Sequence, residues 1–117
     1  MSREIKFRAW DKQNKNMEEV DLLGSNVLHI KNSEWENIED FEVMQFTGLE
    51  DKNGAEIYEG DIIQELKVNW EVVFYKGAWR LGRNVKGDIQ YKSLDRYAYR
   101  CEIIGDIYRN KELLEEK

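Results

Sequence analysis

Cationic and aromatic side chains alternate along residues 76–100, and these residue types bind nucleic acid. The segment holds seven Lys or Arg residues and only two acids, Asp88 and Asp95, so its net charge is +5. Proteins that bind single strands combine a cationic groove with rings on which the bases stack. The pattern therefore predicts a nucleic-acid site at Trp79, Arg80, Arg83, Lys86, Arg96 and Arg100, with Tyr91, Lys92, Tyr97 and Tyr99 between them.

The charge of the whole chain argues against a general nucleic-acid binder. Its formal net charge is −6, whereas contacts to phosphates need a basic face. Trp79, Tyr97 and Tyr99 also occupy alternate positions of apolar runs, which is typical of side chains that point into a core. In this alternative interpretation the neighbouring cations form only a solvated face.

Four carboxylates surround a turn in the middle of the chain, at Asp51, Glu56, Glu59 and Asp61. Carboxylates gathered in this way could hold a hard cation. They could equally cap turns, because Asp51 heads the sequence Asp-Lys-Asn-Gly and Asp61 follows a glycine. Capping is the favoured interpretation, and no glycine-rich phosphate loop accompanies these residues.

The remaining candidates for catalysis are a single histidine, His29, and a single cysteine, Cys101. A zinc site normally needs more ligands of these types. His29 lies beside apolar residues with no sequence signal for a partner, and Cys101 lies in an apolar run that is typical of a small packed side chain. The sequence therefore predicts a protein that is not an enzyme and has no metal or cofactor.

Self-assembly is a third hypothesis, based on the uneven distribution of charge. Residues 34–42 carry five acids and no base, opposite in sign to residues 76–100. Opposite patches steer association and fix its register, and aromatic residues are enriched in interfaces. Exposed Trp10 and Trp35 would suit the core of a homo-oligomeric interface.

The length and composition indicate one intracellular domain over residues 1–117. The chain has 14 aromatic residues among its 117, which argues against disorder. A single cysteine makes no internal disulfide, and the first residues alternate in charge with no apolar run. No apolar segment approaches the roughly 20 residues of a membrane span. We expect no signal peptide, no membrane contact and a location in the cytoplasm of a bacterial host.

Strands are expected to position these residues. Residues 3–10 and 41–46 alternate in polarity, and residues 20–30 form a strand region interrupted at Gly24. Residues 11–16 predict a turn, and residues 33–40 are typical of a short helical turn or of a surface loop. Asn53-Gly54 predicts a tight turn between two short strands in residues 46–61.

The second half of the chain continues this pattern. Alternation over residues 62–74 predicts one bent strand, or two strands with a bend near residues 67–69. Lys76-Gly77 predicts a turn into another strand, residues 83–96 are expected to be rich in loops, and residues 97–105 alternate again. Asn110 is a candidate N-cap for a short C-terminal helix.

Three blocks of the sequence resemble the YopX family of phage and prophage proteins. They are REIKFRAWD near the start, VMQFTGLEDKNGAEIYEGDII in the middle and EIIGDIYRNKELLE at the end. The resemblance implies a phage-derived, intracellular, mainly β protein, and it implies no activity and no catalytic residues. The last block of the family often has a proline after the asparagine, where this chain has Lys111.

The stretch EGDII, followed by the hairpin VVFYKGAWRL, is similar to the strands of SH3-like barrels. We therefore expect a mainly β fold, a small antiparallel barrel or sandwich with an SH3-like core and a short C-terminal helix. The function expected is that of a phage-encoded accessory protein that binds a macromolecule or assembles with itself. Nucleic-acid binding through residues 76–100 is the alternative.

Overall fold

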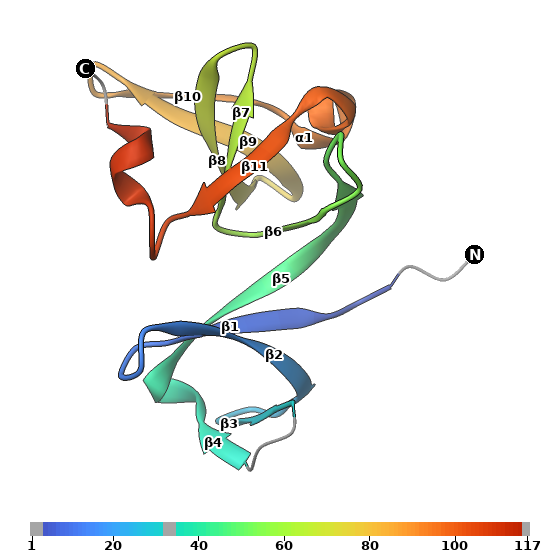
Figure 1. Ribbon diagram of the computed structural model, residues 1–117, viewed down its shortest axis with the longest axis vertical. Helices are drawn as coiled ribbons and strands as arrows, with labels where there is room; N and C mark the ends of the chain where they lie inside the picture. Colours follow the sequence, from blue (N-terminus) through green and yellow to red (C-terminus); the bar gives the residue numbers. More distant parts are fainter. Residues whose placement is uncertain (1–3, 32–34, 116–117) are drawn as a thin grey trace. The chain divides into compact units, whose positions relative to one another are not determined.

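A computed structural model describes residues 4–31 and 35–115 of the chain, and the strand pattern predicted from the sequence dominates it (Figure 1). The chain divides into two compact units, Met1–Phe46 and Thr47–Lys117. The expectation of a single domain over residues 1–117 stays a prediction. No helix among the described residues is long and apolar enough to cross a membrane.

The strands form two antiparallel sheets, so the mainly β fold is confirmed. The first sheet has the order β4-β3-β2-β1-β5-β6. Its strands are β1 (Phe7–Asp11), β2 (Asn16–Leu23), β3 (Val27–Ile30), β4 (Trp35–Asn37), β5 (Phe41–Glu50) and β6 (Glu56–Tyr58). The second sheet has the order β10-β9-β8-β7-β11. Its strands are β7 (Asp61–Glu65), β8 (Val68–Tyr75), β9 (Ala78–Val85), β10 (Asp88–Ser93) and β11 (Glu102–Asp106).

In the first unit, β1 lies between β2 and β5, and β2 and β3 form the strand region interrupted at Gly24. Its core is made of Ala9, Leu28, Ile30 and Phe41. The segment predicted as a short helical turn or a loop contains a strand as well as a helical turn. Its first two residues lie outside the described ones, the next three form strand β4, and Ile38–Asp40 form a 3₁₀ turn capped by the Asn37 side chain.

Three consecutive hairpins build most of the second sheet. Each is closed by two residues with positive φ, namely 53° and 68° at Leu66-Lys67, 50° and 78° at Lys76-Gly77, and 53° and 91° at Lys86-Gly87. Such type I′ turns match the right-handed twist of the flanking strands. Residues 62–74 are therefore two strands rather than one bent strand, and residues 83–96 are more regular than expected.

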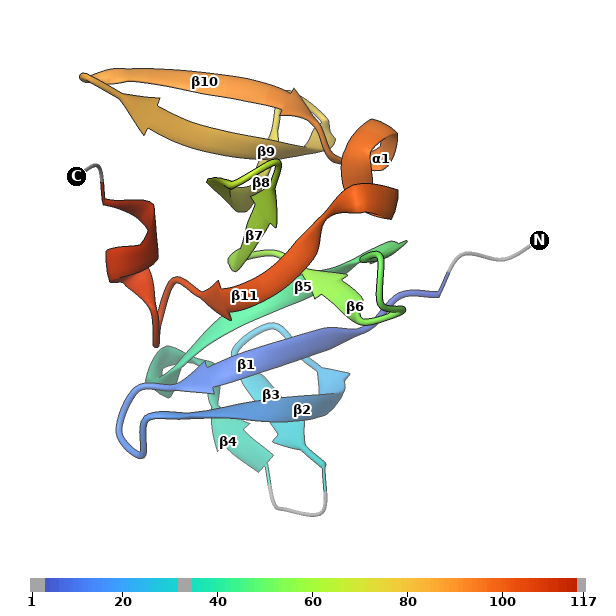
Figure 2. The same cartoon turned by 45° about the horizontal axis from the view of Figure 1, so that its top comes forward.

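The connection from β10 to β11 is helical rather than extended. Helix α1 (Leu94–Tyr97) and a 3₁₀ turn, η2 (Ala98–Arg100), precede β11 (Figure 2). The alternation of residues 97–100 is therefore not a strand, and Tyr99, expected in the core, is 70% exposed. The predicted C-terminal helix is one 3₁₀ turn, η3 (Lys111–Leu114), which the Asn110 side chain does not cap.

The core of the second unit lies against one face of its sheet. It contains Ile57, Ile63, Trp70, Val72, Leu81, Leu94, Ala98 and Cys101, all buried. Among the described residues, β10 and β11 lie at the two ends of the strand order and are not paired with each other. Closure into an SH3-like barrel stays a prediction.

Candidate functional site

The register of β8 and β9 separates the cations of the basic segment onto two faces of the sheet. Val72 lies opposite Leu81, and both side chains are fully buried. Because alternate residues of a strand point to opposite faces, Arg83 lies on this core face and Arg80 on the outer face. Trp79 also lies on the core face, where its ring meets the edge of Phe74 at a centroid distance of 5.0 Å.

On the core face, two cations converge on one buried carboxylate. The Glu65 side chain is only 3% exposed and forms ion pairs with Lys92 and Arg100. The Arg100 Nη2 atom lies 2.5 Å from Glu65 Oε2. Burial raises the pKa of Glu65, but the hydrogen bonds and charges of Lys92 and Arg100 outweigh it and hold that pKa below its usual value.

Aromatic rings surround the same ion pairs. The Lys92 Nζ atom lies 4.6 Å from the ring centroid of Trp70 and 4.5 Å from that of Tyr97. The Arg100 guanidinium lies 4.8 Å from the Tyr97 ring, and the Arg83 guanidinium lies 5.4 Å from the Trp70 ring. Cations at these distances are attracted by the ring quadrupole. We call Glu65, Trp70, Arg83, Lys92, Tyr97 and Arg100 the cation–aromatic cluster.

The structure brings together only part of the predicted nucleic-acid site. Arg83 and Arg100 belong to the cation–aromatic cluster, where Glu65 neutralises part of the charge. Lys86 lies in the turn between β9 and β10, and Arg96 lies on α1. Sequence reasoning missed Glu65, because the alternation over residues 62–74 assigned this residue to the polar face, whereas the turn at Leu66-Lys67 directs it toward the core.

The outer face of β8, β9 and β10 carries a second arrangement of rings and cations. Tyr75 and Tyr91 are stacked, with a centroid distance of 4.2 Å and an interplanar angle of 5°, and both side chains are more than a third exposed. The Lys76 Nζ atom lies 5.4 Å from the Tyr75 ring, and Arg80 Nε donates to the Tyr75 carbonyl at 2.8 Å. The two tyrosines with Lys76 and Arg80 are called the outer tyrosine stack.

A groove of about 280 Å³ adjoins the outer tyrosine stack. Gly82, which has no side chain, leaves space at this point between Tyr91 and Val73. A Cβ atom at Gly82 would lie 3.3 Å from the Tyr91 ring and 3.5 Å from a Val73 methyl group. The groove is also lined by Glu71, whose pKa is raised by burial. The full lining is Glu71, Val73, Gly82, Arg83, Asn84, Ile89, Tyr91 and Leu114.

Two of the four carboxylates around the middle turn, Asp51 and Asp61, act as caps, as the sequence predicted. Asp51 accepts hydrogen bonds from the backbone N–H groups of Asn53, Ala55 and Ile103 at 2.8–3.0 Å. Burial raises the pKa of Asp51, but these donors outweigh it and leave the pKa below its usual value. Asp61, also buried, accepts from the N–H of Tyr58 at 2.7 Å.

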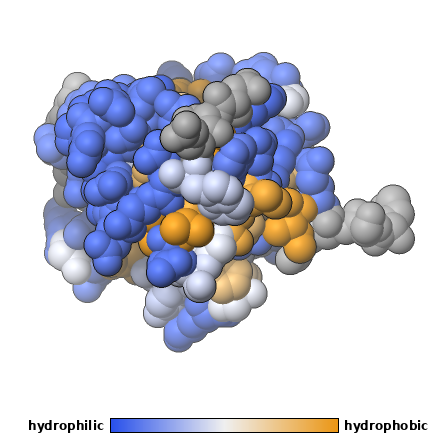
Figure 3. Space-filling model, turned by 90° about the horizontal axis from the view of Figure 1, so that it is seen from below, coloured by the Kyte–Doolittle hydropathy of each residue, from blue (hydrophilic) through white to orange (hydrophobic). Residues whose placement is uncertain are grey.

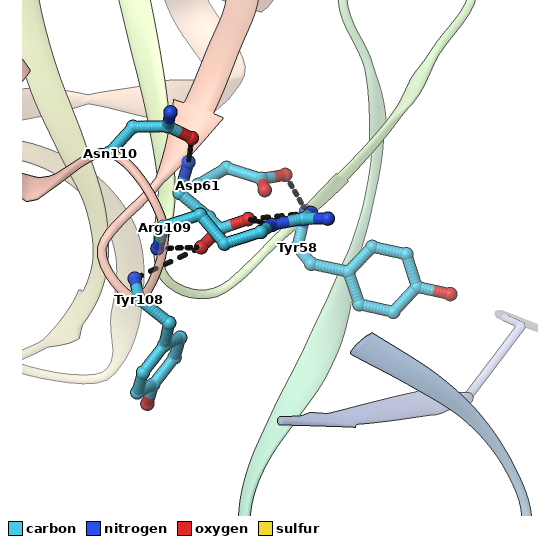
Figure 4. A network of polar contacts seen from close by, with 6 residues as sticks. Tyr58, Asp61, Tyr108, Arg109 and Asn110 are labelled. Atoms are coloured by element: carbon cyan, nitrogen blue, oxygen red, sulfur yellow. Dashed lines mark hydrogen bonds and ion pairs between the residues drawn. The ribbon is translucent and has the colours of Figure 1, made fainter. Parts of the chain in front are cut away.

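A second Gly-Asp turn lies opposite the first, because Asp106 is the register partner of Asp61. Figure 4 shows Asp61 and Tyr58 near Tyr108, Arg109 and Asn110 of this second turn. The Asp106 carboxylate accepts from the N–H groups of Tyr108 and Arg109 and from the Arg109 guanidinium. The Asn110 side chain accepts from the Asp106 N–H. Among the residues that the structure describes, no group of three or more His, Cys, Asp or Glu side chains could hold a metal ion.

Cys101 and His29 have structural environments. Cys101 is fully buried and its thiol donates to the Tyr97 carbonyl at 3.1 Å. Burial raises the pKa of this thiol to about 11, so it is protonated at neutral pH, and the prediction of a packed side chain is confirmed. His29 lies on β3, 3.4 Å from the Asp21 carboxylate and edge-on to the Trp35 ring.

The predicted interface pair is half wrong. Trp35 is 54% exposed, as expected, but Trp10 is buried at 6% exposure on β1. Glu34, at the start of the acidic segment, lies outside the described residues. Other apolar side chains are exposed in the first unit, among them Leu22, Leu23 and Val27. Figure 3 shows a face on which hydrophobic side chains gather among hydrophilic ones.

Comparisons with known proteins identify relatives over nearly the whole chain. The family model described as YopX protein matches residues 6–115. A solved structure of protein EF1440 from Enterococcus faecalis is similar, with 26% identity and a TM-score of 0.55, covering 97% of this chain and all of that one. The structure of protein yopX from Bacillus subtilis is also similar, with 23% identity and a TM-score of 0.61, covering 94% of this chain and 98% of that one. No curated protein matches.

Proposed function

This chain belongs to the YopX family, and from that premise we propose that it is a phage- or prophage-encoded accessory protein that acts in the host cytoplasm by self-assembly rather than by catalysis. The observation that carries the proposal is the outer face of β8, β9 and β10. There Tyr75, Tyr91 and Ile89 are 38%, 37% and 56% exposed around the groove over Gly82. Exposed aromatic and apolar side chains that surround a groove are typical of an interaction surface.

The residues that could support catalysis instead have partners that account for them. Asp51, Asp61 and Asp106 accept backbone hydrogen bonds at turns. The Glu65 carboxylate is held by two cations, and the Cys101 thiol has a pKa of about 11. A nucleophile or general base needs a pKa near the working pH and access to a substrate. These arrangements favour structural roles and support a protein that binds.

Light scattering across a range of protein concentrations tests the proposal. We expect a mass above the 14.0 kDa of one chain, and we expect Ile89→Lys to lower it, because the change places a charge on the apolar outer face. Leu66→Lys is the matched control, since Leu66 is a 72% exposed apolar residue of the same sheet, in the turn between β7 and β8 and away from β10. A mass of one chain at every concentration would refute self-assembly.

Nucleic-acid binding is the second candidate, favoured by the outer tyrosine stack. Two exposed, parallel rings beside Lys76 and Arg80 have the composition of a stacking platform with cations beside it. The test is fluorescence anisotropy with labelled single- and double-stranded DNA at low and at physiological salt. Binding should weaken with salt and in a Lys76→Ala/Arg80→Ala variant, which removes the two cations of the outer tyrosine stack, but not in Lys31→Ala, which changes a cation of the first unit. Absence of binding at low salt would exclude it.

A further inference from the structure

Strand β10 is an edge of the second sheet with an unused hydrogen-bonding side. It comes last in the order β11-β7-β8-β9-β10, and among the described residues it pairs only with β9. Figure 2 shows β10 as the outermost strand of its hairpin. Natural proteins usually protect such edges with proline, a bulge or charges in the strand. The middle of β10, Ile89-Gln90-Tyr91, has none of these.

The geometry of the hairpin determines which backbone groups are available. The two-residue turn at Lys86-Gly87 closes on the register pair Val85 and Asp88. In a hairpin of this type the closing pair is hydrogen-bonded, and the pairs then alternate along the ladder. Asp88, Gln90 and Lys92 therefore direct their N–H and C=O groups toward β9. Ile89 and Tyr91 direct theirs toward the free edge.

The sequence of β10 is complementary to itself when it is read in the opposite direction. The strand carries Asp88, Ile89, Gln90, Tyr91 and Lys92 in that order. If two copies align antiparallel about Gln90, each Asp88 faces the partner's Lys92 and each Ile89 faces the partner's Tyr91. The acid thus meets a base, and an apolar side chain meets an aromatic one. An apolar side chain opposite an aromatic one stabilises antiparallel strands directly.

We propose that a second copy of this chain pairs its β10 with β10 of the first, antiparallel and with Gln90 on the two-fold axis. In this register Ile89 and the partner's Tyr91 form a hydrogen-bonded pair on each side of the axis, and each pair exchanges two backbone hydrogen bonds. The two five-stranded sheets become one continuous sheet. A two-fold interface places the same patch of both copies in contact, which the self-complementary sequence satisfies.

The charges near the edge agree with this arrangement. The Lys92 ammonium binds Glu65 of its own chain, so it is not a free partner for Asp88. Glu65 is paired with both Lys92 and Arg100, so these three side chains keep a net charge of +1, which attracts the Asp88 carboxylate of the second copy. The exposed Ile89 and Tyr91 side chains of both copies lie on the outer face, so the apolar surface of that face extends across the β10–β10 interface. The inference rests on the proposed self-assembly and assigns its surface.

Oxidative crosslinking of single-cysteine positions is a direct test of the register. Gln90→Cys places two thiols opposite each other on the two-fold axis, in a non-hydrogen-bonded pair whose Cα atoms are about 4.5 Å apart, within the range of a disulfide. Asp88→Cys is the matched control, because the two new thiols would lie several residues apart along the strands. Cys101 is fully buried and does not compete. We expect rapid dimer formation, seen on a non-reducing gel, for Gln90→Cys only.

Charge pairing supplies the second arm of the test. The variants Ile89→Lys/Tyr91→Lys and Ile89→Glu/Tyr91→Glu place like charges opposite each other in a homodimer and opposite charges in a mixed dimer. Light scattering should give the mass of one chain for each variant alone and twice that mass for the mixture. Circular dichroism shows whether each variant is folded. If a charged double variant does not fold, the crosslinking of Gln90→Cys alone tests the β10 interface.

Each alternative result has a distinct meaning. A monomeric wild type would overturn both the proposed self-assembly and its surface. An assembled wild type would leave the proposed function standing but overturn the β10 interface under either of two results. One is that Gln90→Cys crosslinks no faster than Asp88→Cys, and the other is that the charged variants keep the wild-type mass. Crosslinking at position 90 together with assembly of only the mixed variants would establish the interface.

Discussion

Replacing Glu65 with glutamine should destabilise the protein far more than a change of one charge on the surface does. The Glu65 carboxylate is 3% exposed and neutralises Lys92 and Arg100, with a third cation, Arg83, beside the same Trp70 ring. Removing one partner of a buried ion pair costs roughly 3–5 kcal/mol, because the remaining charge is left uncompensated. Lys92 and Arg100 are 24% and 37% exposed, so water replaces part of the lost interaction. We therefore expect a loss of about 2–4 kcal/mol.

The assays are urea unfolding and thermal unfolding, each followed by tryptophan fluorescence and by circular dichroism. For 117 residues, a loss of about 3 kcal/mol lowers the melting temperature by about 12 °C. Glu19→Gln is the control, since its ion pair with Lys31 at 3.0 Å is exposed on both sides. Exposed pairs contribute little to stability, so this variant should unfold close to the wild type.

The pH dependence provides an independent check. The pKa of Glu65 is lowered in the folded state, so its contribution to stability is complete above the unfolded pKa of about 4.3 and is lost as the pH falls through the folded value. The difference between wild type and Glu65→Gln should therefore be largest near pH 7 and shrink in acid. A difference below about 1 kcal/mol at pH 7, or one that persists unchanged in acid, would refute this account of the cluster.

Three further predictions concern single positions. Lys67→Gly should stabilise the chain by about 0.5–1 kcal/mol, because Lys67 has φ 68° where the two following hairpins have glycine; lower resistance to urea would contradict this reasoning. Gly105→Ala should destabilise by about 1–3 kcal/mol, because its Cβ would lie 2.5 Å from Asn110 Oδ1 and displace the side chain that accepts from Asp106; an unchanged melting temperature would argue against it. Cys101 should react slowly with a thiol reagent at pH 8 and rapidly in urea, because burial raises its pKa to about 11; rapid labelling of the native wild type would contradict the burial.

The sequence predicted the strands and several turns because their signals are local. Asn53-Gly54 and Lys76-Gly77 both form the turns expected of them, with glycine at positive φ. The turn at Leu66-Lys67 has no such residues, so the sequence left one bent strand and two strands as alternatives. In a continuous strand, the Glu65 side chain would point to the face of the sheet away from Trp70 and Val72. In the hairpin it points to the core face, the same face as Trp70 and Val72. The periodicity of the sequence therefore could not predict that Glu65 lies at the centre of the cation–aromatic cluster.

Tertiary packing also overrides the local pattern between β10 and β11. The alternation of Tyr97, Tyr99 and Cys101 resembles a strand, yet the chain turns through α1 and η2 so that Leu94, Ala98 and Cys101 reach the core. Only Tyr97 of the two tyrosines then packs against that core. The capping role of Asp51 could be predicted from its neighbours, but its bond to Ile103, 52 positions along the chain, could not.

That bond between Asp51 and Ile103 has a consequence for biosynthesis. The middle turn is translated before β11. During synthesis one oxygen of the Asp51 carboxylate therefore lacks its hydrogen-bond donor, the Ile103 N–H, until that residue has been added. Strand β7 likewise lacks one of its two neighbours until Glu102–Asp106 have left the ribosome. Contacts between residues so distant in sequence slow folding, because the chain between them must be ordered first. The second unit therefore completes its fold only after β11 has been made, and until then β7 is an exposed template for pairing with other chains.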